Sequence, residues 1–252
     1  MSTKNIVNSL YIPKSSTHKG QNGKLMIIGG SKAYHGAPIF SILAARRFVD
    51  LLYFHPAEYD EFLVNAVKNI PEVIVEYDMY KIKESDCVLF GIGINEVHID
   101  EEYILKNSKK LVIDGDGLKR IKNNIPIGSL LTPHETEFKM LFELEGTKEN
   151  VKKMAKKYKC VILKKGIPDI ISDGINITIN NVHNQGMTKG GTGDVLAGLV
   201  AALACKNDIY TSAIAATYIN GCAGNILKKN FGFNFCASDL AEELANTYHS
   251  LK

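Results

Sequence analysis

The chain has 252 residues, of which 45% are hydrophobic and 23% are charged, a balance typical of a globular protein with a buried core. The net charge of +3 is mild and the lysine pairs lie on predicted helices or at their ends, so a nucleic-acid partner is not expected. Five cysteines without a C-x-x-C pair indicate a reducing compartment, the cytoplasm, and argue against zinc or a disulfide framework. The longest apolar run, 195–205, is far shorter than the ~20 residues that a membrane span needs.

Short apolar segments alternate with helical patterns along the chain. The segments that predict single strands are 24–28, 51–54, 73–75, 87–90, 111–113 and 160–163. A further pair, 169–172 and 175–179, predicts a hairpin that turns at Asp173-Gly174. Helical spacing predicts helices over about 38–49, 194–205, 209–229 and 238–250. The first of these is expected to start near Pro38, because proline suits the first helical position.

This alternation predicts the fold class. Short apolar strands between helices are typical of a parallel sheet buried on both faces. We therefore expect a three-layer α/β fold with a mainly parallel central sheet flanked by helices. No linker, repeat or low-complexity tract divides the chain, so residues 1–252 are expected to form a single domain. Segment 55–85 offers little pattern beyond its one strand.

Glycine, aspartate and lysine residues follow most of the predicted strands. These strand ends are Gly29-Gly30, Gly91 with Gly93, Asp114 with Asp116, and Lys164-Lys165-Gly166. Ligands of such sheets bind outside the carboxyl ends of the strands. The sequence therefore predicts a binding site at this edge.

A glycine-rich loop at 190–193 is expected to join that edge. Its three glycines are followed at once by Asp194 and then by an apolar helix. Bare backbone N–H groups at a helix N-terminus bind anions such as phosphate. A carboxylate beside a phosphate is explained if Asp194 acts as a base toward a hydroxyl that attacks the phosphate. The alternative is an ordinary glycine turn with Asp194 as the helix N-cap.

Two common phosphate-binding motifs are excluded. The chain contains no G-x-x-x-x-G-K-[ST] run, so it is not a P-loop NTPase. A dinucleotide-binding G-x-G-x-x-G run is also missing, because Glu96 and Leu196 stand where its third glycine would follow Gly93 and Gly193.

The run GGTGDVLAG at 190–198 is similar to the signature of the ribokinase-like superfamily, and more closely to that of the NAD(P)H-hydrate dehydratases. Other segments resemble the same family in the same order along the chain. These are HKGQNGKLMIIGGS at 18–31, YHGAP at 34–38, VIDGDGL at 112–118, LTPHETEF at 131–138, VILKKG at 161–166 and NQGM at 184–187. The resemblance spans roughly residues 18–245.

The resemblance implies a nucleotide-dependent lyase. Enzymes of this family remove water from the S epimer of NADHX or NADPHX, the hydrated forms of NADH and NADPH, using ADP or ATP with Mg²⁺. The ring hydroxyl is phosphorylated, and phosphate then leaves as the double bond forms. The alternative is a small-molecule kinase of the same superfamily that acts on a hydroxyalkyl heterocycle, since it needs the same loop and acid.

The resemblance also implies roles for particular residues. Asp194 is expected to be the catalytic base and to contact the hydrated cofactor together with Ala37, Gly93 and His134. The expected nucleotide-binding residues are Lys165, Gly166, Ile167, Pro168, Asp169, Gly190, Gly191, Thr192 and Gly193. No protein-held metal site is expected. The other histidines, His183 among them, are expected to be non-catalytic.

Each role has a structural alternative. Thr132 to Glu135 also fit a capping box in which Thr132 is the N-cap and His134 is a mere first-turn residue. Asp114 and Asp116 fit turn residues as well as Mg²⁺ ligands. For Lys164 and Lys165 the alternative is a solvated strand end, and for Gly91 and Gly93 it is a turn. For Ala37-Pro38 the alternative is a helix start.

The sequence departs from the family pattern in two places. Residues 135–136 replace the Pro-Gly that is common after the histidine, and Lys189 stands where a neutral residue is commoner. Lys189 is either a phosphate contact or an exposed lysine. The family's epimerase domain has no room in residues 1–17, so the epimerase is expected to be a separate chain. The family also suggests a homo-oligomer, a homotetramer.

Overall fold

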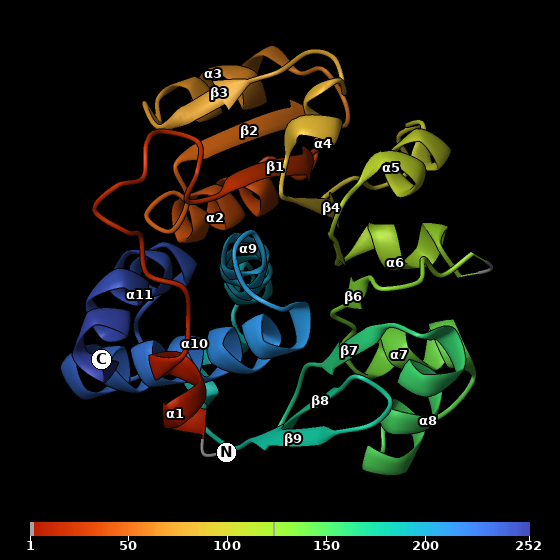
Figure 1. The fold of residues 1–252 in the computed structure, drawn as a ribbon, viewed down its shortest axis with the longest axis vertical. Helices are drawn as coiled ribbons and strands as arrows, with labels where there is room; N and C mark the ends of the chain where they lie inside the picture. The colour runs from red at the N-terminus through yellow and green to blue at the C-terminus, as the bar shows by residue number, and fades with distance from the viewer. Residues whose placement is uncertain (1–2, 123) are drawn as a thin grey trace.

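The computed structural model describes residues 3–122 and 124–252. They form a nine-stranded sheet in the order β3-β2-β1-β4-β5-β6-β7-β8-β9 (Figure 1). All neighbours from β3 to β7 are parallel, and only β7-β8 and β8-β9 are antiparallel. The strands are β1 Lys24–Gly29, β2 Leu51–Pro56, β3 Val73–Val75, β4 Cys87–Ile92, β5 Leu111–Ile113, β6 Leu130–Leu131, β7 Val161–Lys164, β8 Asp169–Ser172 and β9 Ile177–Asn180.

The central strands are continuously apolar because both of their faces are covered. Along β1, Leu25 and Ile27 pack into one hydrophobic cluster, while Met26 and Ile28 pack into the other. This alternation follows from the two-residue period of a strand. The sheet therefore separates two cores, and each core needs its own layer of helices.

Helices cover both faces and complete the three-layer α/β fold that the sequence predicts (Figure 1). One layer packs on the cluster that contains Leu25. It consists of α1 Thr3–Asn8, α2 Gly36–Ala45, α3 Glu61–Lys68, α9 Thr192–Ala204, α10 Ile209–Phe231 and α11 Ala237–Leu251. The opposite layer consists of α4 Lys81–Glu84, α5 Glu101–Asn107, α6 Asp116–Arg120, α7 Glu135–Phe142 and α8 Lys148–Tyr158.

Helices α2 and α9 pack closely, and this contact positions the start of α9. A β-carbon on Gly198 would lie 2.3 Å from the backbone oxygen of Ser41, so only glycine allows this approach. The Ser41 hydroxyl donates a hydrogen bond of 2.7 Å to the backbone carbonyl of Asp194. The first turn of α9 is thereby tied to α2.

Some predicted boundaries were wrong. The helix expected over 38–49 spans Gly36–Ala45, and the helix expected from 194 already begins at Thr192. Segment 55–85 holds α3 and α4 beside the predicted strand β3. None of the helices in the described part of the chain combines the length and apolar character that crossing a bilayer requires.

Candidate active site

The glycine loop ends in a helix N-terminus whose shape depends on glycine. Gly191 is the N-cap of α9 and has φ of 90°, a left-handed conformation that favours glycine. A β-carbon there would lie 2.5 Å from the ring of Phe40. The Thr192 hydroxyl donates a hydrogen bond shared between the carbonyls of Met187, at 2.7 Å, and Lys189, at 2.8 Å. The N–H groups in the first turn of a helix lack partners within it, so the start of α9 is suited to binding an anion.

Asp194 lies in the first turn of α9. Burial raises the pKa of its carboxyl to about 7, and the nearby negative charge of Asp114 adds to the effect. A carboxyl with such a pKa accepts a proton near neutral pH far more readily than an exposed aspartate. The position and the pKa together suit a general base.

A buried ion pair stands beside the glycine loop. Lys165 Nζ donates a hydrogen bond of 2.6 Å to Asp114 Oδ1, which also accepts one of 2.8 Å from Thr132 Oγ1. Burial alone would lower the pKa of Lys165, but the carboxylates of Asp114 and Glu137 outweigh burial, so the pKa is raised and the side chain stays cationic. A β-carbon on Gly193 would lie 3.6 Å from Lys165 Nζ. The ammonium group therefore completes an anion site with the N-terminus of α9.

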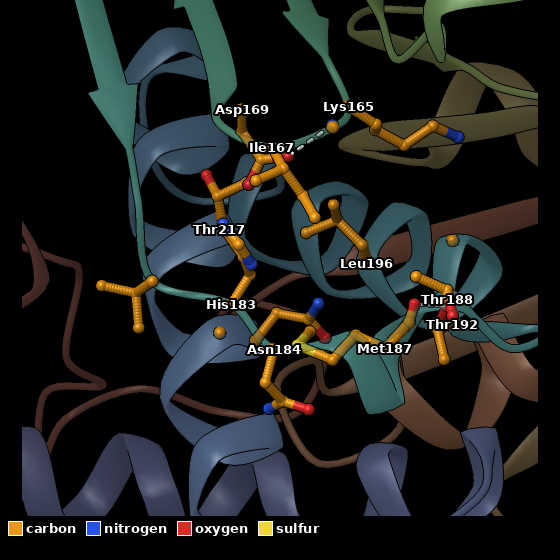
Figure 2. A pocket seen from close by; sticks show the side chains of 15 residues that line it. Lys165, Ile167, Asp169, His183, Asn184, Met187, Thr188, Thr192, Leu196 and Thr217 are labelled. Carbon is orange, nitrogen blue, oxygen red and sulfur yellow. Dashed lines mark hydrogen bonds between the residues drawn. The ribbon is translucent and has the colours of Figure 1, made fainter. Parts of the chain in front are cut away.

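Two cavities flank the start of α9. The first, of about 180 Å³, is shown in Figure 2, and the second, of about 330 Å³, lies on the side of Asp194. The predicted nucleotide-binding residues that line the first cavity are Lys165, Gly166, Ile167, Asp169, Thr192 and Gly193. The predicted substrate-binding residues that line the second are Ala37, Gly93 and Asp194. Pro168, Gly190, Gly191 and His134 lie outside the lining of both cavities, as far as the described residues define them.

The loop after β7 is held in place by Asp169. Its Oδ1 accepts a hydrogen bond of 2.9 Å from the backbone N–H of Gly166 (dashed in Figure 2), and its Oδ2 accepts one of 3.0 Å from Asn180. Burial raises the pKa of Asp169. The carboxylate thus shapes the loop that carries Lys165.

His134 is the N-cap of α7, so the capping box headed by Thr132 was wrong. Its Nδ1 accepts hydrogen bonds from the backbone N–H groups of Thr136, at 3.1 Å, and Glu137, at 3.3 Å. The Glu137 carboxylate in turn accepts one of 2.8 Å from the N–H of His134. An accepting Nδ1 leaves the proton of the neutral ring on Nε2. Thr132 is instead buried against Asp114.

Glu137 is a site residue that the sequence prediction omitted. It lines the second cavity together with Asp194. Burial raises the pKa of its carboxyl, and the Asp114 carboxylate acts in the same direction. The sequence held a motif that could have identified this residue, because Glu137 is part of the run LTPHETEF. The other omitted residues of this cavity are Tyr34, Asn95, Gly115 and Lys119, and Asp116, named above as a strand-end residue, also lines it.

The two lysines at the end of β7 are not a solvated strand end. Lys164 pairs with Glu135 at 3.1 Å, and Lys165 pairs with Asp114 at 2.6 Å. Lys189 is an exposed lysine, as one of the two alternatives predicted, and its Nζ donates hydrogen bonds to the carbonyls of Phe233, at 2.7 Å, and Phe235, at 2.6 Å. These contacts fix the glycine loop to the segment before α11.

The described residues contain no cluster of three or more histidine, cysteine, aspartate or glutamate side chains that could hold a metal. Asp114 is engaged by Lys165 and Thr132. Asp116 accepts hydrogen bonds from the backbone of Asn95 and from Lys119. Both carboxylates are thus held by hydrogen bonds from neighbouring groups.

The mainly parallel sheet, with the glycine loop and Asp194 at its carboxyl edge, gives the chain a ribokinase-like α/β fold. A ribokinase-like superfamily protein from Enterococcus faecalis superposes with a TM-score of 0.88 over 100% of this chain and 95% of that chain, at 22% identity. The ADP/ATP-dependent NAD(P)H-hydrate dehydratase from Bacillus subtilis, co-crystallised with ATP/Mg²⁺, superposes with a TM-score of 0.88 over 100% and 98%, at 21% identity. At such identities the likeness establishes the fold.

Sequence comparison identifies the family. The chain belongs to the NAD(P)H-hydrate dehydratase family, whose model matches residues 25–246. It is 38% identical over 249 residues to the bifunctional NAD(P)H-hydrate repair enzyme Nnr of Methanocaldococcus jannaschii, covering 92% of this chain and 49% of that protein. It is 33% identical over 270 residues to the ADP-dependent (S)-NAD(P)H-hydrate dehydratase of Cenarchaeum symbiosum, covering 93% and 92%. The chain thus spans about half the length of the bifunctional relatives it matches.

Proposed function

We propose that this chain dehydrates the S epimer of NADHX or NADPHX to NADH or NADPH at the expense of ADP or ATP. One observation carries the proposal: the carboxyl of Asp194, in the first turn of α9, lines the second cavity, and the cation Lys165 lines the first. Such an arrangement brings a hydroxyl and a phosphoryl group together. Family membership supplies the nature of the hydroxyl.

The nucleotide belongs in the first cavity. Its terminal phosphate fits against the first N–H groups of α9, and Lys165 neutralises the charge that develops during transfer. Mg²⁺ would arrive on the nucleotide phosphates, since the described residues offer it no cage of their own. The charge it supplies when bound would assist the same transfer.

The hydrated nicotinamide ring belongs in the second cavity, beside Ala37, Gly93 and Asp194. Asp194 takes the proton of the ring hydroxyl, whose oxygen attacks the terminal phosphorus and releases the shortened nucleotide. The carbon–oxygen bond then breaks, phosphate leaves with the electron pair, and the neighbouring ring carbon loses a proton as the double bond forms. The nucleotide is consumed because phosphate is a far better leaving group than hydroxide.

The test is a coupled measurement on the full chain. NADHX with ADP or ATP is expected to regain the absorbance of the reduced nicotinamide ring, with one phosphate released for each ring recovered. D194N serves as the matched inactive control. Transfer of phosphate to a hydroxyethyl heterocycle, with no recovery of NADH, would instead establish the kinase alternative.

Further proposals concern organisation, assembly and place. The chain folds as one domain, acts as a homo-oligomer, a homotetramer in the family pattern, and works in the cytoplasm in the same pathway as an NAD(P)HX epimerase. Light scattering of the purified protein measures the oligomeric state, and a monomer would contradict it.

A further inference from the structure

The first cavity extends well beyond the phosphate site. From Lys165 and Gly193 it reaches helix α10 and the segment 182–184 that follows β9. Gly221 makes this junction possible, because a β-carbon there would lie 1.9 Å from the backbone oxygen of Val182. In Figure 2 His183 and Thr217 lie on one side of the cavity and Leu196 on the other. A ligand held by its phosphate at α9 therefore places its opposite end against α10.

Two polar atoms at that far end have no partner. They are Asn220 Oδ1 and His183 Nδ1, both enclosed by protein and both on residues that line the cavity. Asn220 is 5% exposed. Among the described residues such unpaired buried side-chain atoms number four, so two of the four fall in this one cavity. Buried polar groups in native proteins are nearly always paired, so this concentration points to a missing polar ligand.

The neighbouring polar groups are already paired. The Thr217 hydroxyl donates to the backbone carbonyl of Ala213, one turn earlier in α10. The Asn184 amide bonds to Asn225 at 3.0 Å and to the backbone N–H of Gly186 at 2.9 Å. Asn220 and His183 therefore remain as the groups available to a ligand.

The shape and chemistry of this end suit a purine. Leu196 and Val182 give apolar walls for a flat ring. A side-chain amide carries a donor and an acceptor in one plane, and rotation about its last bond turns either toward the cavity. Adenine offers the complementary pair, an exocyclic amino group beside a ring nitrogen, which asparagine binds with two hydrogen bonds.

We infer that Asn220, assisted by His183, binds the amino edge of the adenine base and selects adenine among nucleotides. The inference rests on the proposed function, in that it takes the first cavity as the nucleotide site. It assigns a role to a histidine for which the sequence offered none. Asn220 recognises the base and takes no part in the phosphoryl transfer.

The test compares ADP with purine riboside 5′-diphosphate, which lacks only the amino group. Dissociation constants are measured by calorimetry for the full wild-type chain and for N220A, H183Q and T217V. Wild type is expected to prefer ADP about tenfold, the effect of one or two neutral hydrogen bonds. N220A is expected to bind both compounds equally, H183Q to lose part of the preference, and the matched control T217V to retain it.

The outcomes separate the two hypotheses. Equal affinity of wild type for ADP and the analogue overturns the inference and leaves the proposed function standing, and this comparison needs no variant to fold. A full preference in N220A overturns the assignment of Asn220. A wild-type chain that binds neither compound contradicts the proposed function itself, and the inference with it.

Discussion

The charge state of one residue, Asp194, controls the reaction proposed here. The carboxyl must be ionised to accept the hydroxyl proton, and burial, reinforced by Asp114, raises its pKa to about 7. Lowering the pH below this value protonates the base. We therefore predict that kcat/KM for NADHX falls about tenfold for each pH unit below about 7 and is level above it.

The pH profile of kcat/KM at saturating ADP measures this directly. D194N is expected to lose roughly 10²–10⁴-fold in activity. Its kcat/KM should not fall below pH 7 in the same way, because its amide cannot take up the proton. A wild-type profile that stays flat well below pH 7 would show that a different group is the base.

Single residues differ in how far their roles could be predicted from the sequence. Asp194 and the glycines before it are contiguous, so their chemistry is visible in one short run. Glu137 was visible only as part of a motif. Asn220 and His183 come from α10 and from the segment after β9, and nothing in the sequence signals that Gly221 lets these two segments touch.

At the scale of elements, the glycine loop is held in place by Lys189, whose role the sequence analysis left open. Lys189 donates to the carbonyls of Phe233 and Phe235 and lies 5.8 Å from the ring centroid of Phe235. We predict that K189M frees the loop and raises the KM for ADP about tenfold, since two charge-assisted hydrogen bonds are lost.

Steady-state kinetics with ADP as the varied substrate measures this effect. K189R is expected to restore part of the affinity, because arginine keeps the donors and the charge. Lys229, exposed on α10, provides the matched control K229M, which should behave as wild type. Unchanged kinetics in K189M would show that the loop holds its shape without the tether.

The packing of α2 on α9 provides the second prediction for an element. A β-carbon on Gly198 would meet the Ser41 oxygen at 2.3 Å and its Cα at 2.6 Å, and both are backbone atoms that cannot turn aside. We predict that G198A lowers the free energy of unfolding by about 3 kcal/mol. Chemical denaturation measures it.

A matched glycine in the same pair of helices gives the control. A β-carbon on Gly36 would meet only the Phe40 ring, at 3.5 Å, an ordinary contact. G36A should therefore change the free energy of unfolding by about 0.5 kcal/mol or less. Equal stability of G198A and wild type would mean that the two helices can separate without cost.

Helices and strands could be predicted where their burial requires a run of apolar residues. The strand β5 was predicted to the residue, because strands covered on both faces become continuous apolar runs. The bounds of β3 were also predicted, although it is an edge strand in which Ile74 is exposed. β6 has two residues, too few to show a pattern. The start of α7 was misplaced because Thr132 and His134 both suit an N-cap, and the contact of Thr132 with Asp114 is a tertiary feature.

At the scale of the whole molecule, the parallel sheet gathers the site from distant parts of the chain. Strands β4, β5 and β7 are followed directly by Gly93, Asp114 and Lys165, and α9 adds the glycine loop on the same edge. The order of the strands in the sheet could not be predicted from the sequence, but their mainly parallel direction could. Since the site joins β-strands to helices of both layers, a ligand bound there should stabilise the entire fold.

We therefore predict that ADP at about 100 times its Kd raises the free energy of unfolding by about 2.7 kcal/mol, which for a chain of this size is roughly 5–11 °C in Tm. G193D tests the location of the phosphate. Its carboxylate would enter the space beside Lys165 Nζ and compete with phosphate for the cation, so the shift should vanish. G193A separates charge from bulk, because its β-carbon makes only an ordinary contact of 3.6 Å. If G193D kept the full ADP shift, the phosphate would have to bind away from the glycine loop, and Asp194 could not face the hydroxyl that attacks it.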